Sequence, residues 1–181
     1  MRQIVSMKFL KVAILCSIAL GLFCVPAIGQ HKVDVSRQFI VRGAVDNPIV
    51  FDISAIKKYV ATDLGDVVVK NHRGRDKKVA KNVKGVLLKT MLDSVHVKVD
   101  KPKQYSELLI VLMATDGYKN VYSWNELMNT DVGYHVFVIT EKDGKSIEEM
   151  DDAIVVISMS DINPGSRYLR GFSKLEIRKV E

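Results

Sequence analysis

Residues 107–128, "ELLIVLMATDGYKNVYSWNELM", carry the clearest structural signal in the chain. The first half is a near-continuous apolar run, which is typical of a strand buried at the centre of a sheet. Asp116 and Gly117 then favour a tight turn. After the turn the chain is extended again and becomes helical, with Ser123 as the expected helix cap and Glu126 three residues later. The stretch therefore predicts a hairpin that leads directly into a short helix.

Shorter signals surround this hairpin. Residues 37–54 alternate apolar and polar side chains and predict two strands joined by a turn at 46–48. Ser54 is expected to cap a short helix, and another short amphipathic helix is expected from about Val86. The remaining strands are expected within residues 66–70, 133–147, 152–159 and 173–180. About seven strands and three short helices, without regular βαβ alternation or an internal repeat, predict an α+β fold with a mixed or antiparallel sheet.

The first 29 residues have the pattern of a secretory signal peptide. Three basic residues precede an apolar stretch at 12–28, and small residues at 27–29 offer a cleavage site near Gly29. Two alternatives stay open: lipidation at Cys16 or Cys24, and an uncleaved anchor. Cleavage would leave residues 30–181 as a single domain, which we expect to be exported to a periplasm.

Removal of the signal peptide would change the chemistry of the chain. Both cysteines lie in the signal segment, so the exported part would have neither a disulfide nor a thiolate ligand. Three of the 27 basic residues also lie there, and the remaining 24 against 21 acidic residues give a net charge of +3. Such a small charge does not indicate nucleic-acid binding.

Common catalytic patterns are missing from the sequence. No Ser-His-Asp arrangement, phosphate loop or dinucleotide fingerprint is recognisable. The four histidines lack the spacing of metal ligands, so no metal-binding residue is predicted: they are His31, His72, His96 and His135. The basic stretch at 70–84 is typical of a solvated surface, with a docking role toward an acidic partner or an anionic membrane as the alternative.

Five segments in a fixed order carry a resemblance to a known family. They are an opening with Gly43, Val45, Pro48, Phe51 and Ile53, then "KGVLLKTML" at 84–92, "ATDGYKNVYSWNEL" at 114–127, a lysine-glycine turn after "HVFVI" at 135–139, and "SRYLRGFSKLEI" at 166–177. Together, from about Phe39 to Arg178, the chain resembles the sulfite-oxidase-type molybdopterin-binding domain. The resemblance implies an α+β domain with a mixed β-sheet, short helices and a cleft at one edge.

The resemblance also implies a cysteine that binds molybdenum, at a position near Lys70, Asn71 or His72. No cysteine stands there, and neither asparagine nor lysine can replace a soft anionic sulfur. His72 is the residue that could ligate a metal in its place. The absence of this cysteine argues against bound molybdenum, while Asn71 and His72 remain candidate contacts for a ligand.

The last loop, 158–171, supplies most of the candidate ligand contacts that the resemblance implies. Arg167 and Arg170 occupy the positions that lie against a pterin and its phosphate, and guanidinium groups suit oxyanions and ring acceptors. Tyr168 lies between them. On a strand, Arg167 and Tyr168 would point to opposite sides, whereas Arg170 would share the side of Tyr168. Asp161 and Asn163 add polar groups suited to the amino-pyrimidine edge of a pterin, or to an ordinary turn.

The turn of the central hairpin completes the candidate site. By resemblance, Tyr118 lies in the cleft, where it could stack on or hydrogen-bond a flat ligand. Asp116 is primarily a turn former and a further candidate contact.

These features lead to one functional hypothesis and two alternatives. The leading hypothesis is an exported, non-catalytic protein that binds a pterin-like small molecule and signals to a membrane-bound partner, as the resemblance to a cysteine-less, exported pterin-binding group implies. The first alternative is a molybdenum oxidoreductase with a non-cysteine ligand, which would work with a redox partner. The second is an adaptor subunit whose pocket holds no ligand.

Overall fold

The first of two sheets contains the predicted hairpin. The computed structural model describes residues 34–70, 77–152 and 154–180. The first sheet has the strand order β2-β1-β10-β5-β6 and is mixed, because β1 and β10 are parallel whereas the other neighbours are antiparallel. Its strands are β1 (Gln38–Gly43), β2 (Ile49–Asp52), β5 (Leu108–Ala114), β6 (Lys119–Ser123) and β10 (Phe172–Lys179).

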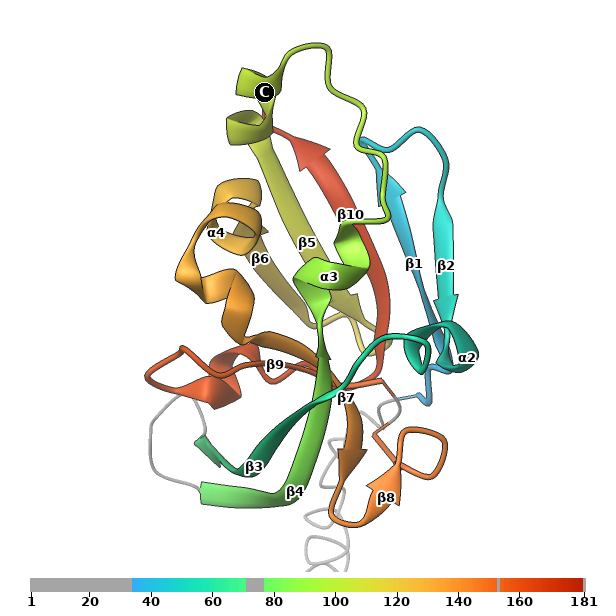
Figure 1. Ribbon diagram of the computed structural model, residues 1–181, viewed down its shortest axis with the longest axis vertical. Helices are drawn as coiled ribbons and strands as arrows, with labels where there is room; N and C mark the ends of the chain where they lie inside the picture. The colour runs from blue at the N-terminus through green and yellow to red at the C-terminus, as the bar shows by residue number, and fades with distance from the viewer. Residues whose placement is uncertain (1–33, 71–76, 153, 181) are drawn as a thin grey trace, which may run out of the picture. The chain divides into compact units, whose positions relative to one another are not determined.

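The second sheet is antiparallel and has the order β3-β4-β7-β8, with β9 also paired to β7 (Figure 1). Its strands are β3 (Thr62–Lys70), β4 (Lys77–Leu87), β7 (Val136–Lys142), β8 (Lys145–Ser146) and β9 (Val156–Ser158). The helices are short: α2 (Ile53–Ile56), α3 (Leu88–Leu92), α4 (Trp124–Asn129) and the 3₁₀ turns η1 (Pro102–Glu107), η2 (Asp131–His135) and η3 (Pro164–Arg167). Mixed sheets with few short helices confirm the α+β class.

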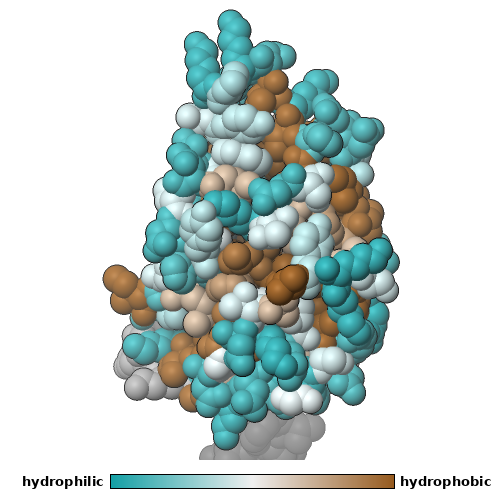
Figure 2. Space-filling model, in the orientation of Figure 1, coloured by the Kyte–Doolittle hydropathy of each residue, from teal (hydrophilic) through white to brown (hydrophobic). Residues whose placement is uncertain are grey.

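One continuous cluster of buried side chains takes in the inward-facing residues of both sheets. Phe39 on β1 lies at ring-centroid distances of 5.0 Å from Phe51 and 4.5 Å from Phe172, so three strands share an aromatic contact. Figure 2 shows polar side chains over most of the face in view, interrupted by small groups of apolar ones. In the part of the chain that the structure describes, no helix is long and apolar enough to cross a membrane.

The central hairpin follows its prediction closely. β5 and β6 are antiparallel neighbours, and Gly117 in the connecting turn has a φ of +86°, a backbone conformation that glycine adopts without strain. The Ser123 side chain accepts a hydrogen bond from the Glu126 amide (3.0 Å), and the Glu126 carboxylate accepts one from the Ser123 amide (3.4 Å). This capping box starts α4, and the predicted cap at Ser123 is confirmed.

Two local predictions are wrong. Asp52, not Ser54, caps α2: its carboxylate accepts a hydrogen bond from the Ala55 amide at 2.7 Å, so the helix begins two residues earlier than expected. Similarly, β4 extends to Leu87 and the helix expected from Val86 begins at Leu88.

The eleven-residue strand β4 is the largest departure from the sequence prediction. Residues 77–87 pair with both β3 and β7, although four lysines and an asparagine disfavour a strand. Asn82 has a positive φ of 50° within the strand, and its amide donates to the Asp66 carboxylate at 3.0 Å. This irregularity interrupts the alternation of apolar residues that would have indicated a strand.

Candidate functional site

A pocket of about 270 Å³ lies between the β5–β6 turn and the segment that contains η3 and leads to β10. Four of the residues predicted from the sequence line it together with a glycine: Asp116, Tyr118, Gly165, Tyr168 and Arg170. The fold therefore brings together residues that are about fifty positions apart in the sequence. The pocket combines two aromatic rings with a carboxylate and a guanidinium group.

A hydrogen bond joins the two loops at the pocket. The Tyr118 hydroxyl donates to the backbone carbonyl of Ser166 at 2.7 Å, although 48% of the Tyr118 residue is exposed. Within the turn, the Asp116 carboxylate accepts from the Tyr118 amide at 2.9 Å. Asp116 thus shapes the turn that holds Tyr118 against the opposite loop.

The other wall is supported by two residues that sequence reasoning did not select. The Lys142 ammonium donates to the Asp152 carboxylate at 2.5 Å and to the Tyr168 hydroxyl at 3.2 Å. Arg170 reaches the other oxygen of Asp152 at 3.5 Å. Tyr168 and Arg170 therefore belong to a network of four residues, which we call the Lys142 network.

Burial and ion pairing oppose each other in the Lys142 network. Burial is the largest single effect and disfavours both charged forms, but the hydrogen bond between Lys142 and Asp152 and the neighbouring polar and charged groups together outweigh it, so the pKa of Lys142 is raised and that of Asp152 is lowered. Burial raises the pKa of the Tyr168 hydroxyl, and the neighbouring Lys142 charge offsets only part of this effect. At neutral pH the network holds a cationic lysine, an anionic aspartate and a neutral tyrosine.

Arg167 belongs to a separate cluster. Its guanidinium lies 2.9 Å from a Glu126 oxygen and 3.5 Å from an Asp161 oxygen, and it covers the Tyr122 ring at 4.3 Å from the centroid. Asp161 also accepts a hydrogen bond from the buried Ser158 hydroxyl at 2.8 Å. The two arginines thus occupy different environments, but the alternation expected for a strand does not apply here, because Arg167 ends the 3₁₀ turn η3 and β10 begins only at Phe172.

The remaining candidate residues are not part of this pocket lining. Asn163 precedes η3 and its side chain makes no cap hydrogen bond there. The candidate contacts Asn71 and His72 lie outside the described residues.

One sequence signal could have drawn attention to Lys142, but not to Asp152. Lys142 ends the apolar segment "VFVITEK" and precedes Asp143 and Gly144, so the sequence suggests a turn. A lysine that ends a buried strand is exceptional unless it is paired, and only 8% of this side chain is exposed. Its partner Asp152 could not be chosen among the neighbouring acidic residues without the structure.

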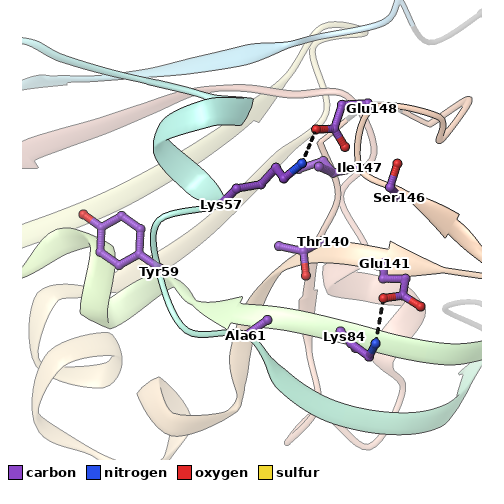
Figure 3. Close-up of a pocket in the computed structure, with 9 residues that line it drawn as sticks. All are labelled: Lys57, Tyr59, Ala61, Lys84, Thr140, Glu141, Ser146, Ile147 and Glu148. Carbon is purple, nitrogen blue, oxygen red and sulfur yellow. Dashed lines mark hydrogen bonds and ion pairs between the residues drawn. The ribbon is translucent and has the colours of Figure 1, made fainter.

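A second pocket, of about 250 Å³, lies beside α2, β4, the end of β7 and the segment from β8 to Glu148 (Figure 3). Lys57 and Glu148 form an ion pair at 2.7 Å on one side of it, and Lys84 and Glu141 form another at 2.8 Å. Each lysine in this lining already has a carboxylate partner, so its charges are balanced within the protein.

The residues present can be compared with the molybdenum cofactor that the resemblance implies. The tyrosines, Arg170 and Asp116 of the first pocket offer the stacking surfaces, donors and acceptors that a pterin ring requires. The chain's two cysteines, Cys16 and Cys24, lie outside the described residues. Within those residues, no group of three or more His, Cys, Asp or Glu side chains is placed to hold a metal ion. The donor set fits the ring, but it supplies no thiolate for a metal.

Comparison with known proteins gives a structural match. No protein-family model matches the sequence, and no curated protein sequence matches it. The sulfane dehydrogenase SoxCD from Paracoccus pantotrophus is similar in structure, with a TM-score of 0.55 and 14% sequence identity over 81% of this chain. The chain spans 40% of the length of that SoxCD chain. The two proteins therefore share a related fold.

Proposed function

We propose that this chain is an exported, non-catalytic binding protein for a pterin-like small molecule, built on a sulfite-oxidase-like domain. The observation that carries the proposal is the pocket formed by Asp116, Tyr118, Tyr168 and Arg170, which joins two flat aromatic side chains to groups of opposite charge. The fold shared with a dehydrogenase and the resemblance of five sequence segments support the same family of domains.

The dimensions and chemistry of the pocket suit a small flat ring. Small-molecule sites usually enclose roughly 300–1,000 Å³, so about 270 Å³ suits a bicyclic ring better than a dinucleotide. A pterin offers a π-face for the tyrosines, a carbonyl and ring nitrogens for donors, and an amino group for a carboxylate. Arg170 has the fork of donors that recognises such acceptors in a plane.

The proposal of a non-catalytic role depends on the missing thiolate. A soft anionic sulfur both binds and tunes molybdenum in the family that the sequence resembles, and asparagine or lysine side chains do not replace it. We therefore propose ligand recognition as the activity, with export after cleavage near Gly29 and a membrane-bound partner that responds to the loaded protein. A molybdenum oxidoreductase is the alternative, and the metal content of the protein distinguishes the two.

Substitution of Arg170 tests the proposed pocket. We expect Arg170→Ala to weaken the binding of pterin (2-amino-4-oxopteridine) by about tenfold or more, because a charged hydrogen bond contributes about 1.5–3 kcal/mol. The measurement is a titration of the mature protein, followed by pterin fluorescence. Arg178→Ala is the matched control, since the two arginine side chains are 50% and 53% exposed and each pairs with one carboxylate. Equal binding by wild type and both variants would exclude Arg170 from the site.

A further inference from the structure

Asp152 holds the position of Arg170 behind the pocket. Its two carboxylate oxygens face different cations, with Lys142 on one and Arg170 on the other. The backbone carbonyl of Asp152 also accepts a hydrogen bond from the Gly171 amide at 3.0 Å, next to Arg170 in the chain. The side chain of Asp152 therefore pairs with the Arg170 guanidinium, and its backbone holds the next residue in the chain.

Lys142 fixes the direction of the hydrogen bond that Tyr168 can offer. An ammonium group has donors and no acceptor, so the Tyr168 oxygen must accept in the 3.2 Å contact. The hydroxyl hydrogen of Tyr168 then remains available for another acceptor. Because Arg170 also presents only donors, this wall of the pocket is a donor wall.

The opposite wall has the reverse character. The Tyr118 hydroxyl already donates its hydrogen to the Ser166 carbonyl, which leaves lone pairs on the oxygen as acceptors. The Asp116 carboxylate takes one hydrogen bond from the Tyr118 amide and has further acceptor capacity. Two walls of opposite hydrogen-bonding character therefore face the same space.

We infer that Lys142 and Asp152 are specificity-determining residues, which orient Tyr168 and Arg170 so that the pocket selects a ring with a carbonyl or oxyanion on one edge and amino or N–H donors on the other. This inference rests on the proposed function and narrows its ligand to oxo-substituted pterin-like rings. A ring with an amino group in place of the carbonyl would direct a donor against the donors of Tyr168 and Arg170. Such a mismatch weakens binding because the opposed donors lose the acceptor that a carbonyl would provide.

Two commercially available ring compounds, pterin and 2,4-diaminopteridine, test the inference. We expect the mature protein to bind pterin at least tenfold more tightly than 2,4-diaminopteridine, which carries an amino group at the position of the carbonyl. Tyr168→Phe and Lys142→Met should reduce this ratio toward one, whereas Lys142→Arg should restore it in part because the guanidinium keeps a donor near Tyr168. Lys145→Met is the control, since Lys145 pairs with the exposed Asp151 at 3.0 Å.

The outcomes separate the inference from the proposed function. Comparable binding of the two rings would overturn the inference and leave the ligand-binding function standing. A preference for pterin that persists in Tyr168→Phe would also overturn it. Binding of neither ring by the unliganded wild-type protein would contradict the proposed function itself. Because Lys142→Met could unfold the protein, a thermal melt accompanies each variant, and Tyr168→Phe keeps the test decisive.

Discussion

Asp152 shows how a single residue connects the stability of the protein with its candidate site. Burial alone would raise the pKa of its carboxyl group, but the hydrogen bond from Lys142 and the charges of Lys142 and Arg170 outweigh burial and lower it. Lys142 is buried with its charge, so removal of Asp152 would leave an unpaired ammonium behind the pocket. The ion pair therefore lies in contact with both Tyr168 and Arg170.

This shift predicts a loss of stability in acid. A carboxyl group whose pKa is lower in the folded state stabilises the protein above its unfolded pKa, and this contribution disappears as the pH falls through the folded value. We expect Asp152→Asn to flatten the decline in the free energy of unfolding below about pH 4, the usual pKa of an unfolded aspartate. Urea denaturation of the wild type and the variant at a series of pH values measures this pH dependence. An unchanged pH dependence would show that the pair contributes no net stability.

Among the elements, the short helix α2 depends on its cap. We expect Asp52→Ala to lower the free energy of unfolding by about 1 kcal/mol, because the Ala55 amide loses its acceptor. Ser54→Ala is the control, and it should change stability by less than about 0.5 kcal/mol. Chemical denaturation of the two variants compares the caps directly. A larger effect for Ser54 than for Asp52 would contradict the assignment.

The parallel contact between β1 and β10 requires a glycine at position 43. Gly43 has a φ of +100°, and a Cβ atom there would lie 2.1 Å from the Ile177 carbonyl oxygen. We expect Gly43→Ala to cost about 2–4 kcal/mol, since it adds a backbone clash to a strained conformation. Gly65→Ala is a matched control with a φ of +64° and no heavy atom within 4 Å of the added Cβ, and about 1 kcal/mol is expected. If urea denaturation showed similar losses of stability for the two variants, the clash with Ile177 would not be the cause of the loss in Gly43→Ala.

At the scale of the whole molecule, the sequence predicted several local features correctly but did not predict which distant strands pair. The run at 108–114, its turn and the Ser123 cap are local, and all three are found. β4 was missed because its lysines and the irregularity at Asn82 hide the alternation, and only pairing with β3 and β7 on both sides makes it a strand. Sequence patterns also give no information on which strands belong to which sheet.

The candidate site shows the same difference between local features, which the sequence predicted, and long-range contacts, which it did not. Residues 116–118 and 165–170 could be selected by turn chemistry and resemblance, whereas their meeting at one pocket depends on the β5–β10 pairing. Lys142 and Asp152 stand 26 and 16 positions from Tyr168, in segments that suggest only a turn and a loop. The ion pair of Arg167 with Glu126 could not be predicted from the sequence either, because the two residues are 41 positions apart.

The central claim is that the pocket binds a pterin-like ring without molybdenum, and the contents of the native protein test it most directly. The mature protein would be purified from its own cell envelope and denatured, and the released material would be analysed by fluorescence and mass spectrometry for pterins, with molybdenum counted in the same sample. We expect a pterin at close to one equivalent and molybdenum far below one. A pterin with stoichiometric molybdenum would contradict the non-catalytic role, and the absence of any pterin would contradict the ligand.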